Sequence, residues 1–109
     1  MENEAPKSGR KVRGSKTGRP VMAALDLLGR RGALRIMWEL RGGAPLTFRG
    51  LASAAELAPA TLNTRLRELR DASIVELADE GYQLTSLGRE LMVALEPLSQ
   101  WATRWSRRG

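Results

Sequence analysis

The segment from Pro59 to Leu69, PATLNTRLREL, constrains the fold more than any other part of the chain. Pro59 suits the first position of a helix, because its missing N–H would be unpaired there and its φ is already helical. Leu62, Leu66 and Leu69 follow at helical spacing, so they form one narrow apolar stripe that has to face a core. The segment is therefore predicted to be an amphipathic helix packed on one side.

The other face of this helix carries small and polar side chains of the kinds that contact DNA. Ala60 is small enough to let a backbone approach, Asn63 can pair with adenine edges, and Thr64 can meet a base or a phosphate. Arg67 can reach a guanine or a phosphate, and Arg65 and Arg70 flank this surface. Taken alone, the segment is equally compatible with an ordinary amphipathic helix whose polar face is solvated.

The preceding segment favours a helix-turn-helix. Thr47 can cap a helix from about Phe48 to Glu56, and Leu57-Ala58 would form the turn before Pro59. A helix, a tight turn and a second helix make this motif, whose second member enters the major groove.

Two strand-like runs follow, Ile74 to Leu77 and Tyr82 to Thr85, with Asp79-Glu80-Gly81 as the turn between them. These three pieces are predicted to form a β-hairpin. A hairpin directly behind a recognition helix is a wing. Residues 44–47 are brief and extended before Pro45, and could supply one further short strand.

The remaining segments are predicted to be helical. A first helix starts after Arg19 and ends at Gly29, and its apolar face is Val21, Leu25 and Leu28. A second runs from about residue 31 to residue 41, with Gly32 in its first turn and with Leu34, Met37, Trp38 and Leu40 facing inward. The last helical segment covers residues 86–108, and Pro97 should kink or restart it.

The final segment also predicts a homodimer. Trp101 and Trp105 lie one helical turn apart in a chain whose aromatic content is only 5%, and so small a chain has little interior left for both. They pack either on the protein's own first helix or on a symmetry mate, and we favour the second arrangement. The expected dimer residues are Leu91, Leu95, Leu98, Trp101 and Trp105.

Composition narrows the function classes. The length of 109 residues suits one domain, and there is no cysteine and no histidine, which excludes disulfides, thiol chemistry and the common zinc sites. An enzyme is the least supported class, because no nucleophile-base pair, phosphate loop or metal cluster appears, and no cofactor is expected. No signal peptide or membrane span is visible, so the protein is expected to be cytoplasmic.

Positive charge points to a polyanionic partner, double-stranded DNA. The net charge is +6, and residues 1–20 hold six basic and two acidic side chains. Residues 1–18 are predicted to be a disordered basic arm, which acts as a DNA-contacting arm or only as a solubilising leader, and residues 19–109 the domain.

Several of these segments together resemble the HxlR-type winged-helix transcription regulators. The matching pieces are Ala24 to Gly29, Leu34 to Leu40, Leu62 to Leu69, Gly81 to Thr85, Leu87-Gly88 and Leu98 to Trp101. The resemblance implies a MarR-like winged helix, a homodimer built from the terminal helices, and binding to a palindromic operator near a promoter. The predicted fold class is accordingly mainly α with a small β-wing, dimerising through the N- and C-terminal helices.

The chain departs from the family pattern at four places. Arg19 replaces a cysteine that serves redox sensing in some members, so thiol sensing is excluded. Gly32 replaces a tryptophan, which should weaken the second helix by about 1 kcal/mol. The space left by the missing side chain is either filled by neighbouring residues, which we favour, or open as an effector pocket beside the dimer helices. Ala58 replaces a capping serine, and the acidic wing tip Asp79-Glu80 should repel phosphates.

The leading hypothesis is therefore a sequence-specific regulator that binds an operator as a homodimer. Asn63, Thr64 and Arg67 are expected to face bases, with Thr61 and Arg65 near phosphates and with Thr47 and Arg49 as further phosphate contacts. The alternative is a winged-helix protein-interaction module that has lost operator binding, which the acidic wing and the two substitutions at Gly32 and Ala58 favour. A small-molecule effector stays open as a further partner.

Overall fold

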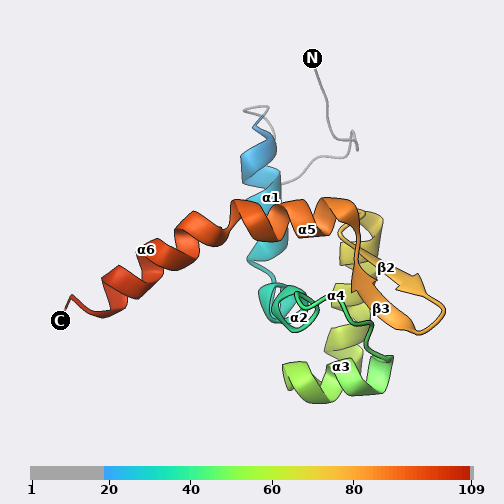
Figure 1. Cartoon of the computed structure of the whole chain (residues 1–109). Coiled ribbons are helices and arrows are strands. Elements are labelled where there is room, and N and C mark those ends of the chain that lie inside the picture. Colours follow the sequence, from blue (N-terminus) through green and yellow to red (C-terminus); the bar gives the residue numbers. More distant parts are fainter. Residues whose placement is uncertain (1–18, 109) are drawn as a thin grey trace.

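A computed structural model describes residues 19–108, so the predicted basic arm lies outside the described residues. In chain order the elements are α1 (Pro20–Leu28), α2 (Ala33–Glu39), α3 (Phe48–Ala55), α4 (Pro59–Asp71), β2 (Val75–Ala78), β3 (Gly81–Leu84), α5 (Ser86–Ala94) and α6 (Glu96–Ser106). The order is that of a winged helix-turn-helix, as predicted (Figure 1). No helix in the described part is long and apolar enough to cross a membrane.

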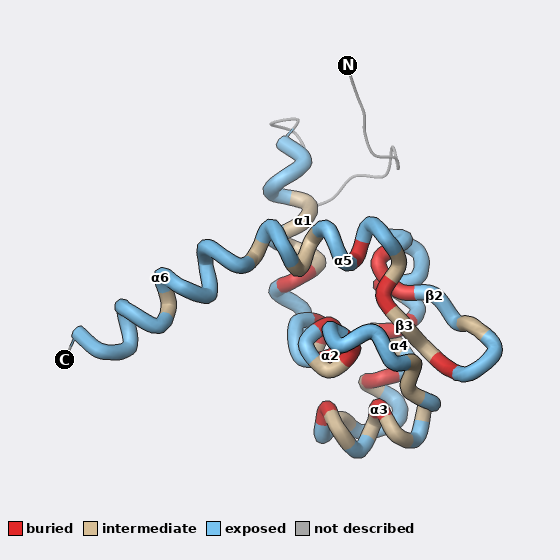
Figure 2. The backbone as a smooth tube through the Cα atoms, viewed as in Figure 1, coloured by how far each residue is buried: buried red, intermediate tan, exposed pale blue. Residues whose placement is uncertain are grey.

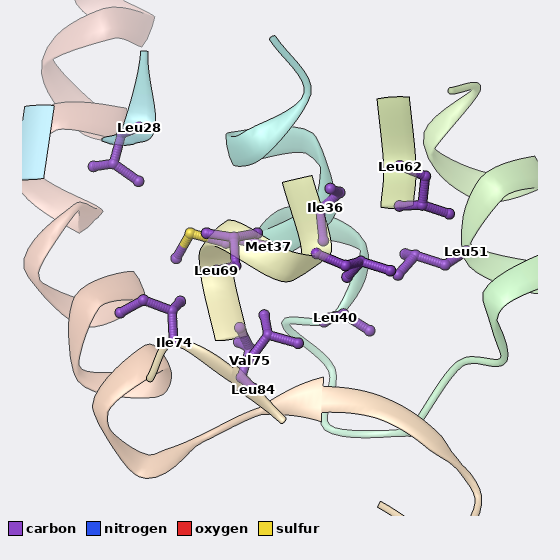
Figure 3. Packing of buried hydrophobic residues seen from close by; sticks show 11 residues of the cluster. Leu28, Ile36, Met37, Leu40, Leu51, Leu62, Leu69, Ile74, Val75 and Leu84 are labelled. Atoms are coloured by element: carbon purple, nitrogen blue, oxygen red, sulfur yellow. The ribbon is translucent and has the colours of Figure 1, made fainter. Parts of the chain in front are cut away.

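The core lies where α2, α3 and α4 meet the base of the hairpin (Figure 3). The predicted stripe of α4 is confirmed, because Leu62, Leu66 and Leu69 are all buried. They pack with Ile36, Met37, Leu40, Leu51, Ile74, Val75 and Leu84, drawn from the surrounding elements. One face of α4 is therefore fixed to the body, and its other face is left to the surface.

The predicted hairpin is present, with each strand shifted by one residue from its expected bounds. Strands β2 and β3 are antiparallel, with Val75 opposite Leu84 and Ala78 opposite Gly81, which leaves Asp79 and Glu80 as a two-residue turn. The expected third strand is reduced to one bridge, in which Leu46 pairs with Tyr82. This bridge ties the segment before α3 to the wing.

Helix α2 differs most from its prediction. It is shorter than expected, and two of its four predicted inward residues, Leu34 and Trp38, are about half exposed. The buried face is made by Ala33, Ile36 and Met37, with Leu40 just after the helix. Leu34 and Trp38 stand four residues apart and so share a different side of the helix, and the expectation that they face inward was wrong.

Gly32 also has another role than the one expected. It lies before the first turn of α2 and caps that helix in the left-handed conformation, with φ of 88°. A glycine adopts this φ without the steric cost that other residues meet, so the expected weakening of α2 does not follow. The space beside Gly32 is occupied by Leu57, whose Cδ1 would lie 2.8 Å from an added Cβ.

The last helical segment is interrupted, as Pro97 predicted. Helix α5 ends at Ala94, and α6 begins at Glu96 with Pro97 in its first turn. Helix α6 projects away from the body (Figure 1), and none of its residues is buried (Figure 2). Helix α1 buries Leu28 and exposes Val21 and Leu25, so both terminal helices carry uncovered apolar side chains.

Candidate nucleic-acid interface

The helix-turn-helix begins with a capped α3. The Oγ1 of Thr47 accepts a hydrogen bond from the backbone N–H of Gly50 at 3.0 Å, which confirms the predicted cap. At the other end, Glu56 turns the chain with a φ of 56°. Helix α4 then starts at Pro59 without a side-chain cap, because Ala58 has no acceptor to offer.

Asn63 and Arg67 lie on the exposed face of α4. Neither side chain makes a hydrogen bond or an ion pair with any residue of the described range 19–108. Both line an open hollow of about 580 Å³ between α4 and the wing, together with Tyr82 and others. The groups expected to contact bases are therefore presented outward, with their hydrogen-bonding capacity unused.

Thr61 and Thr64 are half-buried on the same helix. The hydroxyl of Thr64 donates to the backbone carbonyl of Ala60 at 3.1 Å, within α4 itself. The oxygen of that hydroxyl can still accept a hydrogen bond. Thr61 lies in the first turn of α4, where the helix N–H groups have no partners within the helix.

Arg65 lies elsewhere than expected. Its Nε donates to the carbonyl of Arg31 at 2.9 Å, and its guanidinium pairs with Glu68 at 2.5 Å. Only 18% of its side chain is exposed. Arg65 is about 200° around the helix from both Asn63 and Arg67, at 100° per residue, so the structure does not bring it together with them. The positions of the arginines in the sequence of α4 did not indicate that Arg65 makes these contacts within the fold.

The sequence placed Arg70 beside the polar face of α4, but Arg70 was not among the expected DNA contacts. Arg70 is exposed and lines the same hollow as Asn63 and Arg67, and its side chain has no partner within residues 19–108. It follows Arg67 by three residues and Asn63 by seven, so it shares their face. This helical spacing was the signal that could have identified it.

The start of α3 adds two of the expected phosphate contacts. Thr47 and Arg49 are both exposed, and the guanidinium of Arg49 has no partner among the described residues. The hydroxyl of Thr47 uses its oxygen as the cap, so its O–H remains able to donate.

The wing is acidic where it faces the solvent. Asp79 and Glu80 are exposed at its tip, and the carboxylate of Glu76 accepts a hydrogen bond from the amide of Gln83 at 2.7 Å. Helix α4 contributes Arg67, Arg70 and Asp71 to the lining of the hollow, and the wing contributes Glu76. Within the described residues no group of three or more His, Cys, Asp or Glu side chains could hold a metal ion.

The predicted dimer residues fall into two groups. Leu91 and Leu95 are half-buried and pack against the core of their own chain. Leu98, Trp101 and Trp105 on α6 are each about half exposed. The rings of Trp101 and Trp105 stack, with centroids 5.6 Å apart and planes 10° from parallel.

Comparisons with known proteins agree with this architecture. The family described as HxlR-like helix-turn-helix matches residues 27–109. A helix-turn-helix-type transcriptional regulator of Methanocaldococcus jannaschii is 26% identical over 89 residues, which cover 77% of this chain and 83% of the relative. The reduced form of the regulator YodB from B. subtilis superposes with a TM-score of 0.72 at 29% identity, over 84% of this chain and 97% of YodB. A MarR family protein of Mycobacterium tuberculosis is similar at a TM-score of 0.62 and 31% identity, over 86% of this chain and 73% of that one.

Proposed function

Because the chain belongs to the HxlR-like helix-turn-helix family of transcriptional regulators, we propose that it binds an operator as a homodimer, with α4 in the major groove. The observation that supports this function best is the exposed face of α4. Asn63, Arg67 and Arg70 share that face, and no side chain of the described fold engages them. A helix presented in this way suits base readout flanked by phosphate contacts.

Each contact has a distinct task. Asn63 can make two hydrogen bonds to an adenine, and Arg67 can do the same with a guanine. Thr64 supplements these two at the base edges. Thr61 in α4 and Thr47 and Arg49 at the start of α3 hold phosphates, which fix the register of the helix but carry no sequence information.

The dimer would form through the apolar side chains that one chain leaves uncovered. They lie on the terminal helices: Val21 and Leu25 on α1, and Leu98, Trp101 and Trp105 on α6. A two-fold axis through these helices would present two copies of α4 to two half-sites, so the operator is expected to be palindromic.

The test begins with an operator selected from random duplexes by the purified full chain. Arg67→Ala and Asn63→Ala are then expected to weaken binding to that operator about 5- to 150-fold, since a bidentate base contact is worth about 1–3 kcal/mol. Binding is measured by mobility shift at fixed salt. Arg107→Ala is the matched control for Arg67→Ala. It removes the same charge from an exposed arginine that lies just after α6.

The acidic wing tip favours a second candidate function, a protein-interaction module that no longer binds an operator. The two candidates differ in their dependence on salt. Operator binding weakens steeply as salt rises, because phosphate contacts release counterions. If Asn63→Ala and Arg67→Ala bind every duplex as well as the parent chain does, operator binding through α4 is wrong and the second candidate gains.

A further inference from the structure

Three consecutive residues of the turn between α1 and α2 contact the helix-turn-helix. We call residues 29–32 the α1–α2 corner. Arg30 pairs with Glu68 of α4 at 3.1 Å, and the carbonyl of Arg31 accepts from Arg65 of α4 at 2.9 Å. Gly32 approaches Leu57, in the turn before α4, so closely that a Cβ would meet its Cδ1 at 2.8 Å. The corner is therefore seated on α4 by polar contacts and on the preceding turn by an apolar one.

Glu68 is the centre of the polar part. Its Oε1 accepts from Arg65 and its Oε2 from Arg30, so each carboxylate oxygen holds one guanidinium. Arg30 in turn pairs with Asp26 of α1 at 3.4 Å. The chain of charges Asp26, Arg30, Glu68 and Arg65 thus runs from α1 to α4 without a break.

This chain of charges lies apart from the exposed DNA-binding face. Glu68 is about 140° around the helix from Asn63, at 100° per residue, and its side chain is 26% exposed. Both of its oxygens are engaged within the fold. Glu68 is therefore placed to affect DNA binding through the orientation of α4, without contacting the DNA itself.

The charged residues Asp26, Arg30, Glu68 and Arg65 connect α1 with α4, and these two helices have different proposed functions. Helix α1 exposes Val21 and Leu25, which belong to the proposed dimer face, whereas α4 carries the reading face. Apolar packing is non-directional, but charge-assisted hydrogen bonds to guanidinium groups have defined geometry. Contacts of this second kind can hold α4 at one angle to the dimer axis.

We propose that Glu68 is a positioning residue which, with Arg30 and Arg65, fixes α4 relative to α1 and so sets the half-site spacing that the dimer accepts. This inference rests on the proposed function of operator binding as a homodimer. It assigns Arg65 to the positioning of the recognition helix instead of to a phosphate.

The test compares Glu68→Gln with Glu90→Gln. Glu90 is exposed on α5, and its side chain has no partner among the described residues, so both variants remove one negative charge. Electrostatics alone would make both bind DNA slightly more tightly. Positioning instead predicts that Glu68→Gln binds the selected operator about two- to fivefold more weakly, the scale of partly exposed ion pairs, while Glu90→Gln does not.

The preference for one half-site spacing tests the positioning role directly. A substitution that only destabilised the fold would leave this preference unchanged. Operators with one base pair added to or removed from the centre are titrated in parallel. The parent and Glu90→Gln should prefer the selected spacing, whereas Glu68→Gln should bind the three spacings more equally. Arg30→Gln should also lose the spacing preference. In the variant that carries both substitutions the loss should be smaller than the sum of the two single losses, since both break the pair between Arg30 and Glu68.

The outcomes separate the inference from the function on which it rests. If the parent selects a spaced operator and both Glu68→Gln and Arg30→Gln keep its spacing preference, the inference is wrong and the function stands. If the parent selects no operator or binds as a monomer, both fail. Thermal melts confirm that the variants are folded, and Arg30→Gln carries the test if Glu68→Gln does not fold, because 46% of the Arg30 side chain is exposed.

Discussion

Glu56 ends α3 in the left-handed conformation, with φ of 56°, at the turn of the helix-turn-helix. A side chain with a Cβ costs about 1 kcal/mol or more in this conformation, and glycine avoids that cost. Glu56→Gly is therefore expected to raise the free energy of unfolding by up to about 1 kcal/mol, as measured by urea denaturation.

The control for Glu56→Gly is the same substitution in a helix. Glu90 lies inside α5, where glycine costs about 1 kcal/mol relative to good helix formers. Glu90→Gly should therefore destabilise the protein. If both substitutions destabilise the protein, the left-handed conformation of Glu56 does not carry the steric cost that glycine would remove.

Gly88 permits a close approach between α5 and Ile74, the residue before β2. A Cβ on Gly88 would lie 2.2 Å from the carbonyl oxygen of Ile74. That oxygen is held by the N–H of Thr85 at 3.0 Å and cannot move aside cheaply. Gly88→Ala is expected to lower the free energy of unfolding by about 1–3 kcal/mol, the usual cost of overpacking.

Gly42 provides the matched comparison for Gly88. Nothing lies within 4 Å of a Cβ built there. Gly42→Ala should leave the denaturation midpoint nearly unchanged in the same experiment. Equal midpoints for the two variants would contradict the close contact between Gly88 and Ile74.

Residue-level predictions from the sequence succeeded where the cause is local. Thr47 caps α3 because a hydroxyl at that position meets N–H groups of the next turn, which lie nearby in the chain. Arg65 and Gly32 could not be assigned in this way. Their partners, Arg31 and Leu57, are distant in sequence, and the tertiary fold alone brings them within reach.

At the scale of elements, periodicity identified α4 and misjudged α2. The leucines of α4 form one stripe, so they leave a single choice of buried face. Helix α2 has apolar residues on two sides, and its sequence does not say which side is buried. In the structure the buried side is that of Ala33, Ile36 and Met37, and the exposed side is that of Leu34 and Trp38. Only the packing of neighbouring helices decides between such faces, and that information is absent from one helix's sequence.

The wing permits a prediction at the same scale. Asp79 and Glu80 place negative charge at the tip of the wing, and the wing borders the hollow beside α4. Replacing both, as Asp79→Asn with Glu80→Gln, is expected to strengthen operator binding several-fold, about 1 kcal/mol for charges near a phosphate. The gain should shrink at high salt, because added ions screen exposed charges.

Titration of operator affinity against salt measures this effect, and Glu90→Gln shows how much the loss of a negative charge on α5 contributes. If neutralising the tip leaves operator affinity unchanged at low salt, the wing does not approach the phosphates. The acidic tip would then have no effect on operator binding, and a role in binding a protein partner would remain as its explanation.

At the scale of the whole molecule, α6 is the helix whose apolar side chains the rest of the described chain does not cover. It has 11 residues, none of them buried, yet three large apolar side chains lie along it: Leu98, Trp101 and Trp105. An isolated helix of this length is marginal in water. The helix therefore needs a covering surface, and the proposed homodimer supplies one.

This proposal makes thermal stability depend on protein concentration. A partner that binds only the folded chain raises the melting temperature by mass action, so dilution of the parent should lower it. Leu98→Asp places a charge on the apolar side of α6 and is expected to give a monomer by sedimentation, with lower helix content by circular dichroism. Gln100→Asp is the control on the same helix, because Gln100 is exposed and lies about 200° from Leu98 at 100° per residue. A dimer that survives Leu98→Asp unchanged would place the interface away from α6, and the uncovered tryptophans would then require another partner.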